Sequence, residues 1–306
     1  MITIQLRAGM WNQMFQYAFG KALTKKHNTD LKLDLKYLQD HWFYKELLKE
    51  TSRNYDLWNF QVKGFDFSKK SIHNYLLWPF GEMRNFVGII YNNIYHKIIW
   101  QKIIRERWFR YNEEFKKQSL DNEYIIWYRQ SYKYFESIND EIKSEFIPKV
   151  PLNELCQNML DDINNSNSIC INIRRSDYTG DPLFYVQDNS YYQEWVKIIK
   201  EKLWYPKDIK IFVFSDDIKR CQENINFDDV ETIYVGKEYA WPAYTHYMRL
   251  MWNGKHFVWA NSSFCRRAIW QNRNSNKIII LPKNRFTNPD MPVNDLIPDY
   301  RKAIRI

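Results

Sequence analysis

Short apolar runs alternate with stretches of helical periodicity along the second half of the chain, and this alternation restricts the possible folds more than any other feature. The runs are rich in Ile, Val, Phe and Tyr and have the length of buried strands. The pattern predicts a doubly wound α/β domain with a parallel sheet. Strands are expected at Ile169–Ile173, Lys210–Phe214, Glu231–Val235, His256–Trp259 and Lys277–Leu281. Helices are expected at Tyr191–Leu203, Asp217–Asn224, Trp241–Trp252 and Ser262–Gln271.

The first half opens in the same way and then becomes less regular. A strand is expected at Ile2–Leu6, followed by a turn at Ala8–Trp11. The next stretch has apolar residues at i, i+3, i+4, i+7 and i+8, which predicts an amphipathic helix. A second strand fits Leu31–Leu35, and the next clear strand signal is Tyr124–Tyr128.

Length and composition indicate two folded domains that need no covalent cross-links. A chain of 306 residues, 45% of them hydrophobic, buries roughly 75% of its unfolded surface. The segment Pro148–Pro151 is the candidate linker, which predicts domains over residues 1–148 and 149–306. The cysteines form no C-x-x-C pair, which disfavours a zinc site and a secreted disulfide framework and favours the cytoplasm. They are Cys156, Cys170, Cys221 and Cys265.

The net charge of +9 arises mostly in the first half. Isoleucines at i, i+4 and i+8, namely Ile90, Ile94 and Ile98, predict a helix with an apolar stripe. The flanking basic residues are Lys97, Lys102, Arg105, Arg107 and Arg110. Such a helix either contacts an anionic membrane from its inner face or packs in the core with a solvated basic face. Nucleic-acid-binding signatures are absent, and no apolar stretch has the length of a membrane span. A signal peptide is not expected, because Met1 leads directly into a strand-like stretch without a basic leader.

Charged residues directly follow the strand predicted at Ile169–Ile173. Arg174 and Arg175 come first, and Asp177 and Asp181 follow in the same loop. The carboxyl ends of strands in an open α/β sheet face the crevice where ligands bind. Two guanidinium groups suit phosphate oxygens there, while Asp177 could fix one of them or handle a proton. A surface ion pair at the strand end is the alternative.

Three other strand-to-helix turns are candidates for ligand contact. Ser262 and Ser263 follow the strand at His256–Trp259, where hydroxyl groups and a helix N-terminus suit a phosphate. On this motif alone, an ordinary helix N-cap formed by Ser262 or Ser263 is the favoured interpretation. Asp216 stands at the end of another predicted strand, where its carboxylate could contact a ligand or simply cap the next helix. The turn before Asn12 could also approach a ligand, but it lacks the G-x-G-x-x-G pattern of dinucleotide-binding turns.

Taken in order, these motifs resemble those of the α-1,2-fucosyltransferases of glycosyltransferase family 11. Asn12–Ala18 is similar to the N-terminal family motif Asn-Gln-(Met/Leu)-Phe-Gln-Tyr-Ala. Asn172–Tyr178 resembles the central His-x-Arg-Arg-Gly-Asp-Tyr motif, and Phe214–Asp217 matches Phe-Ser-Asp-Asp. Ala260–Phe264 resembles Ala-Asn-Ser-(Thr/Ser)-Phe, and Lys277–Lys283 is similar to the segment that follows it.

The resemblance implies a GT-B fold, in which two Rossmann-like domains face a cleft. It also implies inverting, metal-independent transfer of fucose or a close 6-deoxyhexose from a GDP donor to a glycan hydroxyl. An α-1,2 linkage in surface polysaccharide or O-antigen synthesis, with an oligosaccharide or lipid-linked acceptor, is expected. Residues 149–306 would bind the GDP-sugar, and residues 1–148 would lie on the acceptor side. The sequence itself contains no Asp-x-Asp pair, the usual metal motif of sugar-nucleotide transferases.

The same resemblance assigns roles to individual residues. Arg174 corresponds to the phosphate-binding arginine, with Arg175 and Asp177 beside it. Asn12 corresponds to an amide near the sugar and acceptor. The remaining residues expected to bind the donor are Asn172, Asp216, Ser262 and Ser263.

Several positions depart from the family pattern. Trp11 replaces a glycine, and Asn172 replaces the histidine of the central motif. The Cys265–Arg267 segment is closer to the α-1,6 and peptide O-fucosyltransferases. These departures leave an alternative open: a catalytically impaired glycan- or nucleotide-binding module.

Inverting transfer requires a base for the acceptor proton, and a carboxylate is the usual solution. We expect Asp181 to serve rather than Asp177, because Asp177 is adjacent to the arginines and would pair with one of them.

Overall fold

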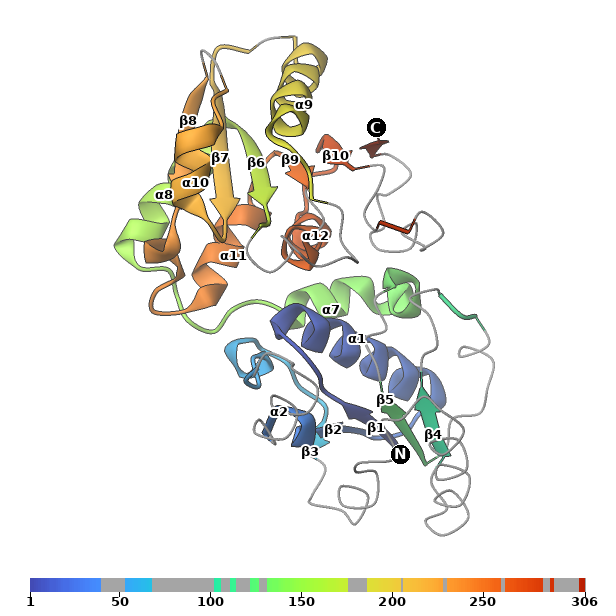
Figure 1. Ribbon diagram of the computed structural model, residues 1–306. Coiled ribbons are helices and arrows are strands. Elements are labelled where there is room, and N and C mark those ends of the chain that lie inside the picture. Colours follow the sequence, from blue (N-terminus) through green and yellow to red (C-terminus); the bar gives the residue numbers. More distant parts are fainter. Residues whose placement is uncertain are drawn as a thin grey trace. The chain divides into compact units, whose positions relative to one another are not determined.

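The computed structural model describes residues 1–39, 53–67, 102–105, 111–113, 122–126, 131–175, 186–204, 206–227, 230–259, 262–282, 287–288 and 303–305. The chain divides into two compact units, which we call the N-terminal unit (Met1–Ile147) and the C-terminal unit (Pro148–Ile306). Each unit contains one sheet of parallel strands (Figure 1). This arrangement confirms the predicted α/β class with two Rossmann-like domains.

The N-terminal unit has a five-stranded sheet in the order β3-β2-β1-β5-β4, with β1 in the centre. All of its strand pairs are parallel. Its elements are β1 (Ile2–Gln5), α1 (Met10–His27), β2 (Leu31–Asp34), α2 (Lys36–Gln39), η1 (Leu57–Asn59), β3 (Asp66–Phe67), β4 (Lys102–Arg105), β5 (Glu123–Ile126), η3 (Tyr132–Tyr134), η4 (Glu136–Ile138) and α7 (Asn139–Glu145).

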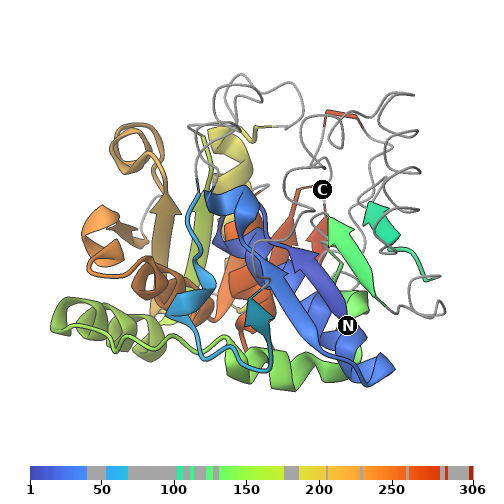
Figure 2. The same ribbon diagram turned by 90° about the horizontal axis from the view of Figure 1, so that it is seen from below.

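Helix α1 packs against β1 and β2, and the two views in Figures 1 and 2 show it running alongside the sheet. Phe15 and Phe19 lie on its buried face. A β-carbon on Gly20 would approach side-chain atoms of Leu31 and Ile4 to 2.7 and 2.8 Å, so this glycine permits the close contact with the sheet. The helix ends at Asn28, whose φ of 49° is the left-handed conformation common at helix C-termini.

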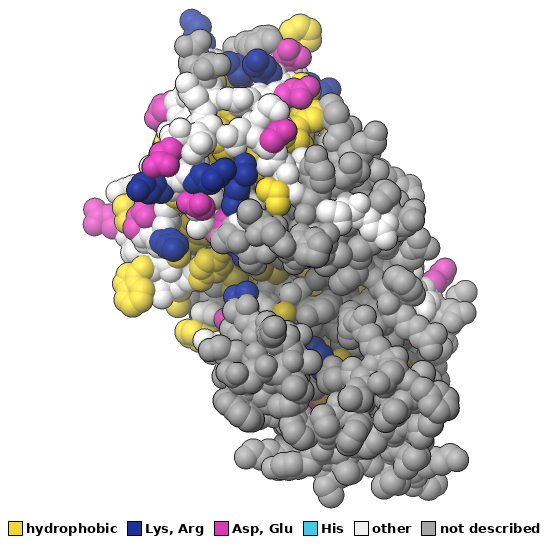
Figure 3. Space-filling view, in the orientation of Figure 1, with side chains coloured by type: hydrophobic (Ala, Val, Ile, Leu, Met, Phe, Trp, Pro, Cys, Tyr) yellow, Lys and Arg dark blue, Asp and Glu magenta, His cyan; other side chains and the backbone are white. Residues whose placement is uncertain are grey.

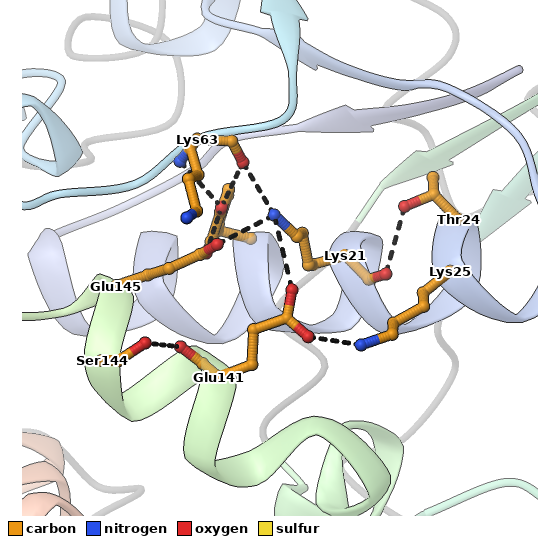
Figure 4. A network of polar contacts seen from close by, with 8 residues as sticks. Lys21, Thr24, Lys25, Lys63, Glu141, Ser144 and Glu145 are labelled. Carbon is orange, nitrogen blue, oxygen red and sulfur yellow. Dashed lines mark hydrogen bonds and ion pairs between the residues drawn. The ribbon is translucent and has the colours of Figure 1, made fainter.

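Helix α7 is fastened to α1 by a network of polar contacts (Figure 4). The buried Glu145 carboxylate accepts hydrogen bonds from Tyr17 Oη over 2.5 Å and from Lys21 Nζ over 2.9 Å. Lys21 also donates to the Lys63 carbonyl oxygen over 2.9 Å. The more exposed Glu141 pairs with Lys25 at the edge of the network.

The C-terminal unit has a six-stranded sheet in the order β11-β10-β9-β6-β7-β8, and all of its pairs are parallel. Side chains of β6 and β7 form a core with those of α9 and α10. Its elements are α8 (Glu154–Asn165), β6 (Asn167–Ile173), α9 (Asn189–Lys202), β7 (Ile209–Ser215), α10 (Ile218–Asn224), β8 (Glu231–Val235), η5 (Lys237–Ala240), α11 (Tyr244–Trp252), β9 (His256–Trp259), α12 (Ser263–Gln271), β10 (Ile279–Leu281) and β11 (Ile304–Arg305).

Two predicted helices differ from the structure. The prediction of a basic helix is wrong at Lys102–Arg105, because this segment forms strand β4 and pairs with β5. The rest of that predicted helix, including its three isoleucines, lies outside the described residues. The helix expected at Trp241–Trp252 begins only at Tyr244, because Pro242 disfavours helical geometry at the preceding residue.

None of the helices in the described ranges is long and apolar enough to cross a membrane. The same ranges contain no cluster of three or more His, Cys, Asp or Glu side chains placed to hold a metal ion.

We predict that Glu145→Ala lowers the free energy of unfolding by roughly 2–4 kcal/mol, because it leaves the Lys21 amine and the Tyr17 hydroxyl without their buried carboxylate. Urea denaturation measures the change. Glu141→Ala is the matched control on the same helix, and its more exposed pair should contribute less than about 1 kcal/mol. Equal losses for the two variants would contradict a special role for Glu145.

Candidate active site

A pocket of about 230 Å³ lies in the C-terminal unit, where β6, β7 and β9 end. It lies where the chain order reverses, since β7 and β8 extend from one side of β6 and β9 and β10 from the other. Ligands of open α/β sheets bind at such switch points. The pocket is lined by Asn172, Ile173, Arg174, Ser215, Asp216, Lys237, Ala240, Tyr244, Tyr247, Ser262 and Phe264.

Arg174 and Asp216 form an ion pair inside this pocket. Arg174 follows β6, Asp216 follows β7, and the distance from Nη1 to Oδ2 is 3.2 Å. The other carboxylate oxygen of Asp216 accepts a hydrogen bond from the backbone N–H of Arg175 over 3.0 Å. Asp216 therefore joins the two strand ends and orients the guanidinium group of Arg174.

Arg175, the second arginine of the predicted phosphate-binding pair, does not line the pocket. Its guanidinium group donates to Asn189 Oδ1 over 3.0 Å and to the Gln187 carbonyl oxygen over 3.4 Å. Asn189 begins α9. The contacts of Arg175 therefore fasten the start of α9 to the end of β6.

Ser262 brings the N-terminus of α12 to the pocket. It is the N-cap of α12, and its Oγ accepts a hydrogen bond from the backbone N–H of Phe264 over 3.2 Å. The indole N–H of Trp259, at the end of β9, donates to the Ser262 carbonyl oxygen over 2.7 Å. The structure confirms that Ser262 caps a helix, and it also places this residue in the lining of the pocket.

Aromatic side chains also line the pocket and were not predicted. The ring of Tyr244 lies 5.8 Å from that of Tyr247 and 5.9 Å from that of Phe264. Burial raises the pKa of Tyr247 well above the ordinary value, so its hydroxyl stays protonated and donates to the Ser215 carbonyl oxygen over 3.4 Å. Lys237, two residues beyond β8, was also missed, although the strand-end rule used for Arg174 could have found it.

Figure 3 shows Lys and Arg side chains next to Asp and Glu side chains on the described surface of the C-terminal unit. The described part of this face is therefore mixed in charge rather than uniformly basic. Among the residues that line the pocket, Arg174 and Lys237 carry two positive charges, and Asp216 carries one negative charge. The charge of the pocket lining therefore favours an anionic ligand.

The predicted residue Asn12 lies in the first turn of α1, in the N-terminal unit, and its backbone N–H donates to the Gly9 carbonyl oxygen. Its neighbour Gln13 is fully buried and holds two segments together. The Gln13 amide donates to the carbonyl oxygens of Ala8 and Asn54 and accepts from the backbone N–H of Asp56.

The positions of three predicted side chains are not described by the structure. Asp177 and Asp181 lie outside the described residues, and so does the side chain of Ser263, although its backbone begins α12. The structure therefore brings together Asn172, Arg174, Asp216 and Ser262 from the predicted set.

The model of the family described as "Glycosyl transferase family 11" matches residues 1–292. The chain belongs to this family. It is 28% identical over 316 aligned positions to an alpha-1,2-colitosyltransferase of Escherichia coli, with 100% of this chain and 98% of the relative covered. It is 25% identical to the O-antigen biosynthesis glycosyltransferase WbnK of Escherichia coli, with 92% and 93% covered.

A solved structure of a FUT1 variant from Arabidopsis thaliana in complex with GDP has a TM-score of 0.51 and 10% sequence identity, covering 97% of this chain and 72% of that chain. This likeness supports the GT-B fold. The family match and the two relatives make the chain a glycosyltransferase of the fucosyltransferase type.

Proposed function

We propose that this glycosyltransferase moves fucose, or a close 6-deoxyhexose, from a GDP donor to a hydroxyl group of a glycan. The observation that carries the proposal is the position of Arg174, which lies in the switch-point pocket beside the N-cap of α12. The GDP complex of the FUT1 variant supports a GDP-linked donor. The names of the two bacterial relatives support an α-1,2 linkage and a role in O-antigen synthesis.

The pocket residues can stabilise the charge that develops on the leaving group. When the bond between the sugar and the diphosphate breaks, negative charge accumulates on the phosphate oxygens. Donors already aimed at that charge lower the barrier without reorganising. The Arg174 guanidinium and the N-terminus of α12 supply such donors, so in this proposal GDP leaves without the help of a metal ion.

The volume of the pocket suggests how the donor is accommodated. At about 230 Å³ it is smaller than the roughly 300–1,000 Å³ of pockets that enclose most of a drug-sized ligand. It therefore suits only part of the nucleotide, such as the diphosphate and the ribose. We assign GDP-sugar binding to residues 149–306 and the acceptor side to residues 1–148, where Asn12 would contact the sugar or acceptor.

Inversion requires the acceptor oxygen to attack the sugar carbon from the face opposite the diphosphate. The acceptor hydroxyl then loses its proton to a base, which we assign to Asp181, six residues beyond Arg175 in the sequence.

The first prediction from this proposal concerns Arg174. Arg174→Ala should lower turnover on the order of 10²-fold or more while leaving the fold intact, because the lost contact acts mainly in the transition state. Steady-state kinetics and thermal unfolding measure the two effects. Arg175→Ala is the matched control: it removes contacts to the start of α9 and should reduce stability more than Arg174→Ala does. Near-normal turnover by folded Arg174→Ala protein would remove the assignment.

The second prediction concerns the base. Asp181→Asn should lower turnover on the order of 10²-fold, the lower end of what general-base catalysis contributes. The measurement is the steady-state rate of both proteins at one pH, with thermal unfolding as the check that the variant is folded. Retention of more than half of the wild-type rate would exclude Asp181.

The third prediction concerns donor, linkage and metal. A screen of GDP-, UDP- and ADP-linked sugars against glycan acceptors should give product only with GDP-6-deoxyhexoses, and NMR should show the inverted anomeric configuration. The chelator EDTA should leave the rate unchanged. Activity that is abolished by EDTA and restored by Mn²⁺ would contradict the metal-independent mechanism, and a preference for another nucleotide would contradict the donor assignment.

A further inference from the structure

Asn172 carries a buried hydrogen-bond acceptor at the wall of the pocket that no described residue satisfies. The side chain is 4% exposed and belongs to the penultimate residue of β6. Its Nδ2 donates to the Phe214 carbonyl oxygen on the neighbouring strand over 3.4 Å. Within the described ranges, its Oδ1 has no hydrogen-bond partner. Most buried polar atoms in proteins have a partner, so this atom requires an explanation.

The orientation of the Asn172 amide follows from its neighbour on β7. Exchanging Oδ1 and Nδ2 would place two acceptors, the amide oxygen and the Phe214 carbonyl oxygen, 3.4 Å apart. The donating nitrogen must therefore remain toward Phe214. The acceptor is left for another group, and Asn172 is one of the residues that line the pocket.

The chemistry of an amide oxygen limits which part of a nucleotide it can contact. An ionised diphosphate offers only acceptors, so it cannot satisfy Oδ1. The donors of a GDP-sugar are the ribose hydroxyl groups, the N–H groups of the base and the hydroxyl groups of the transferred sugar. A group that contacts Asn172 must therefore belong to one of these three parts.

The spacing between Asn172 and Arg174 favours the ribose. Two residues along a strand span roughly 6.6 Å. Two groups are attached directly to the diphosphate, the ribose and the transferred sugar, and in the proposed function the sugar faces the acceptor. The base lies further from the phosphates. With the diphosphate at Arg174, a ribose hydroxyl comes within reach of Asn172 before the base does.

Resting on the proposed GDP donor, we propose that Oδ1 of Asn172 accepts a hydrogen bond from a ribose hydroxyl of the nucleotide. Asn172 is then a specificity-determining residue that distinguishes ribonucleotides from deoxyribonucleotides. A neutral amide suits this position better than a carboxylate, because a negative charge two residues from Arg174 would oppose the bound diphosphate.

Calorimetric titration with GDP, 2′-deoxy-GDP, 3′-deoxy-GDP and IDP tests the proposal. The wild-type protein should bind GDP about 5- to 30-fold more tightly than one of the two deoxy analogues, as expected when a buried acceptor loses its donor. In Asn172→Leu, which removes the acceptor at similar volume, GDP and that analogue should bind equally within about twofold. Asn253→Leu is the control, because Asn253 does not line the pocket.

Each other outcome has a definite meaning. If the wild-type protein binds both deoxy analogues as tightly as GDP, the inference fails whether or not the variant folds. If Asn172→Leu keeps the discrimination against the deoxy analogue, the inference also fails. Loss of the preference for GDP over IDP in Asn172→Leu would assign the acceptor to the base instead. No binding of GDP by the wild-type protein would contradict the proposed function itself.

Discussion

Parallel pairing of β6 with both β7 and β9 is the constraint on which the candidate active site depends. The register aligns Asn172 with Phe214 on one side and with Trp259 on the other. Residues that follow these three positions therefore meet at one edge of the sheet. The strand interior has no room for charge, since Ile169, Ile171 and Ile173 are fully buried. Charged side chains appear as soon as the strand leaves the core, and they do so at the switch point.

The sequence predicted most strands of the C-terminal sheet because each is a short apolar run bounded by polar or turn-forming residues. It missed α8 and misread Lys102–Arg105, where basic residues around two isoleucines look like one face of a helix. Pairing with β5, a contact distant in sequence, makes this segment a strand. Local periodicity cannot reveal such a partner.

The site was predictable to the extent that its residues adjoin strand ends. Arg174, Asp216 and Ser262 follow β6, β7 and β9, and the same rule applied to β8 would have included Lys237. Tyr247 could not be found in this way, because it lies inside α11 and reaches the pocket through helix packing. The contacts of Arg175 could not be predicted from the sequence either, because its partner Asn189 is separated from it by 14 positions.

The N-terminal motif shows that a family signature can consist largely of residues that hold the scaffold together. Gln13 holds the turn before α1 to the segment around Asn54, and the Gln16 amide oxygen accepts from the backbone N–H of Arg7. Tyr17 joins α1 to Glu145 on α7. These buried side chains account for three motif positions by structure, whereas Asn12 is only half-buried.

The ion pair between Arg174 and Asp216 raises the question of whether Asp216 would compete with a bound diphosphate. The pair is partly exposed to solvent, at 31% and 14% for the two side chains, and partly exposed pairs contribute little, about 1 kcal/mol or less. A diphosphate offers more charge and more acceptor oxygens, so it can draw the guanidinium away at small cost. Asp216 would not then be left unsatisfied, because it keeps its hydrogen bond from the Arg175 backbone N–H. The carboxylate thus positions Arg174 in the pocket, and the Arg174 guanidinium can still move to a diphosphate at small cost.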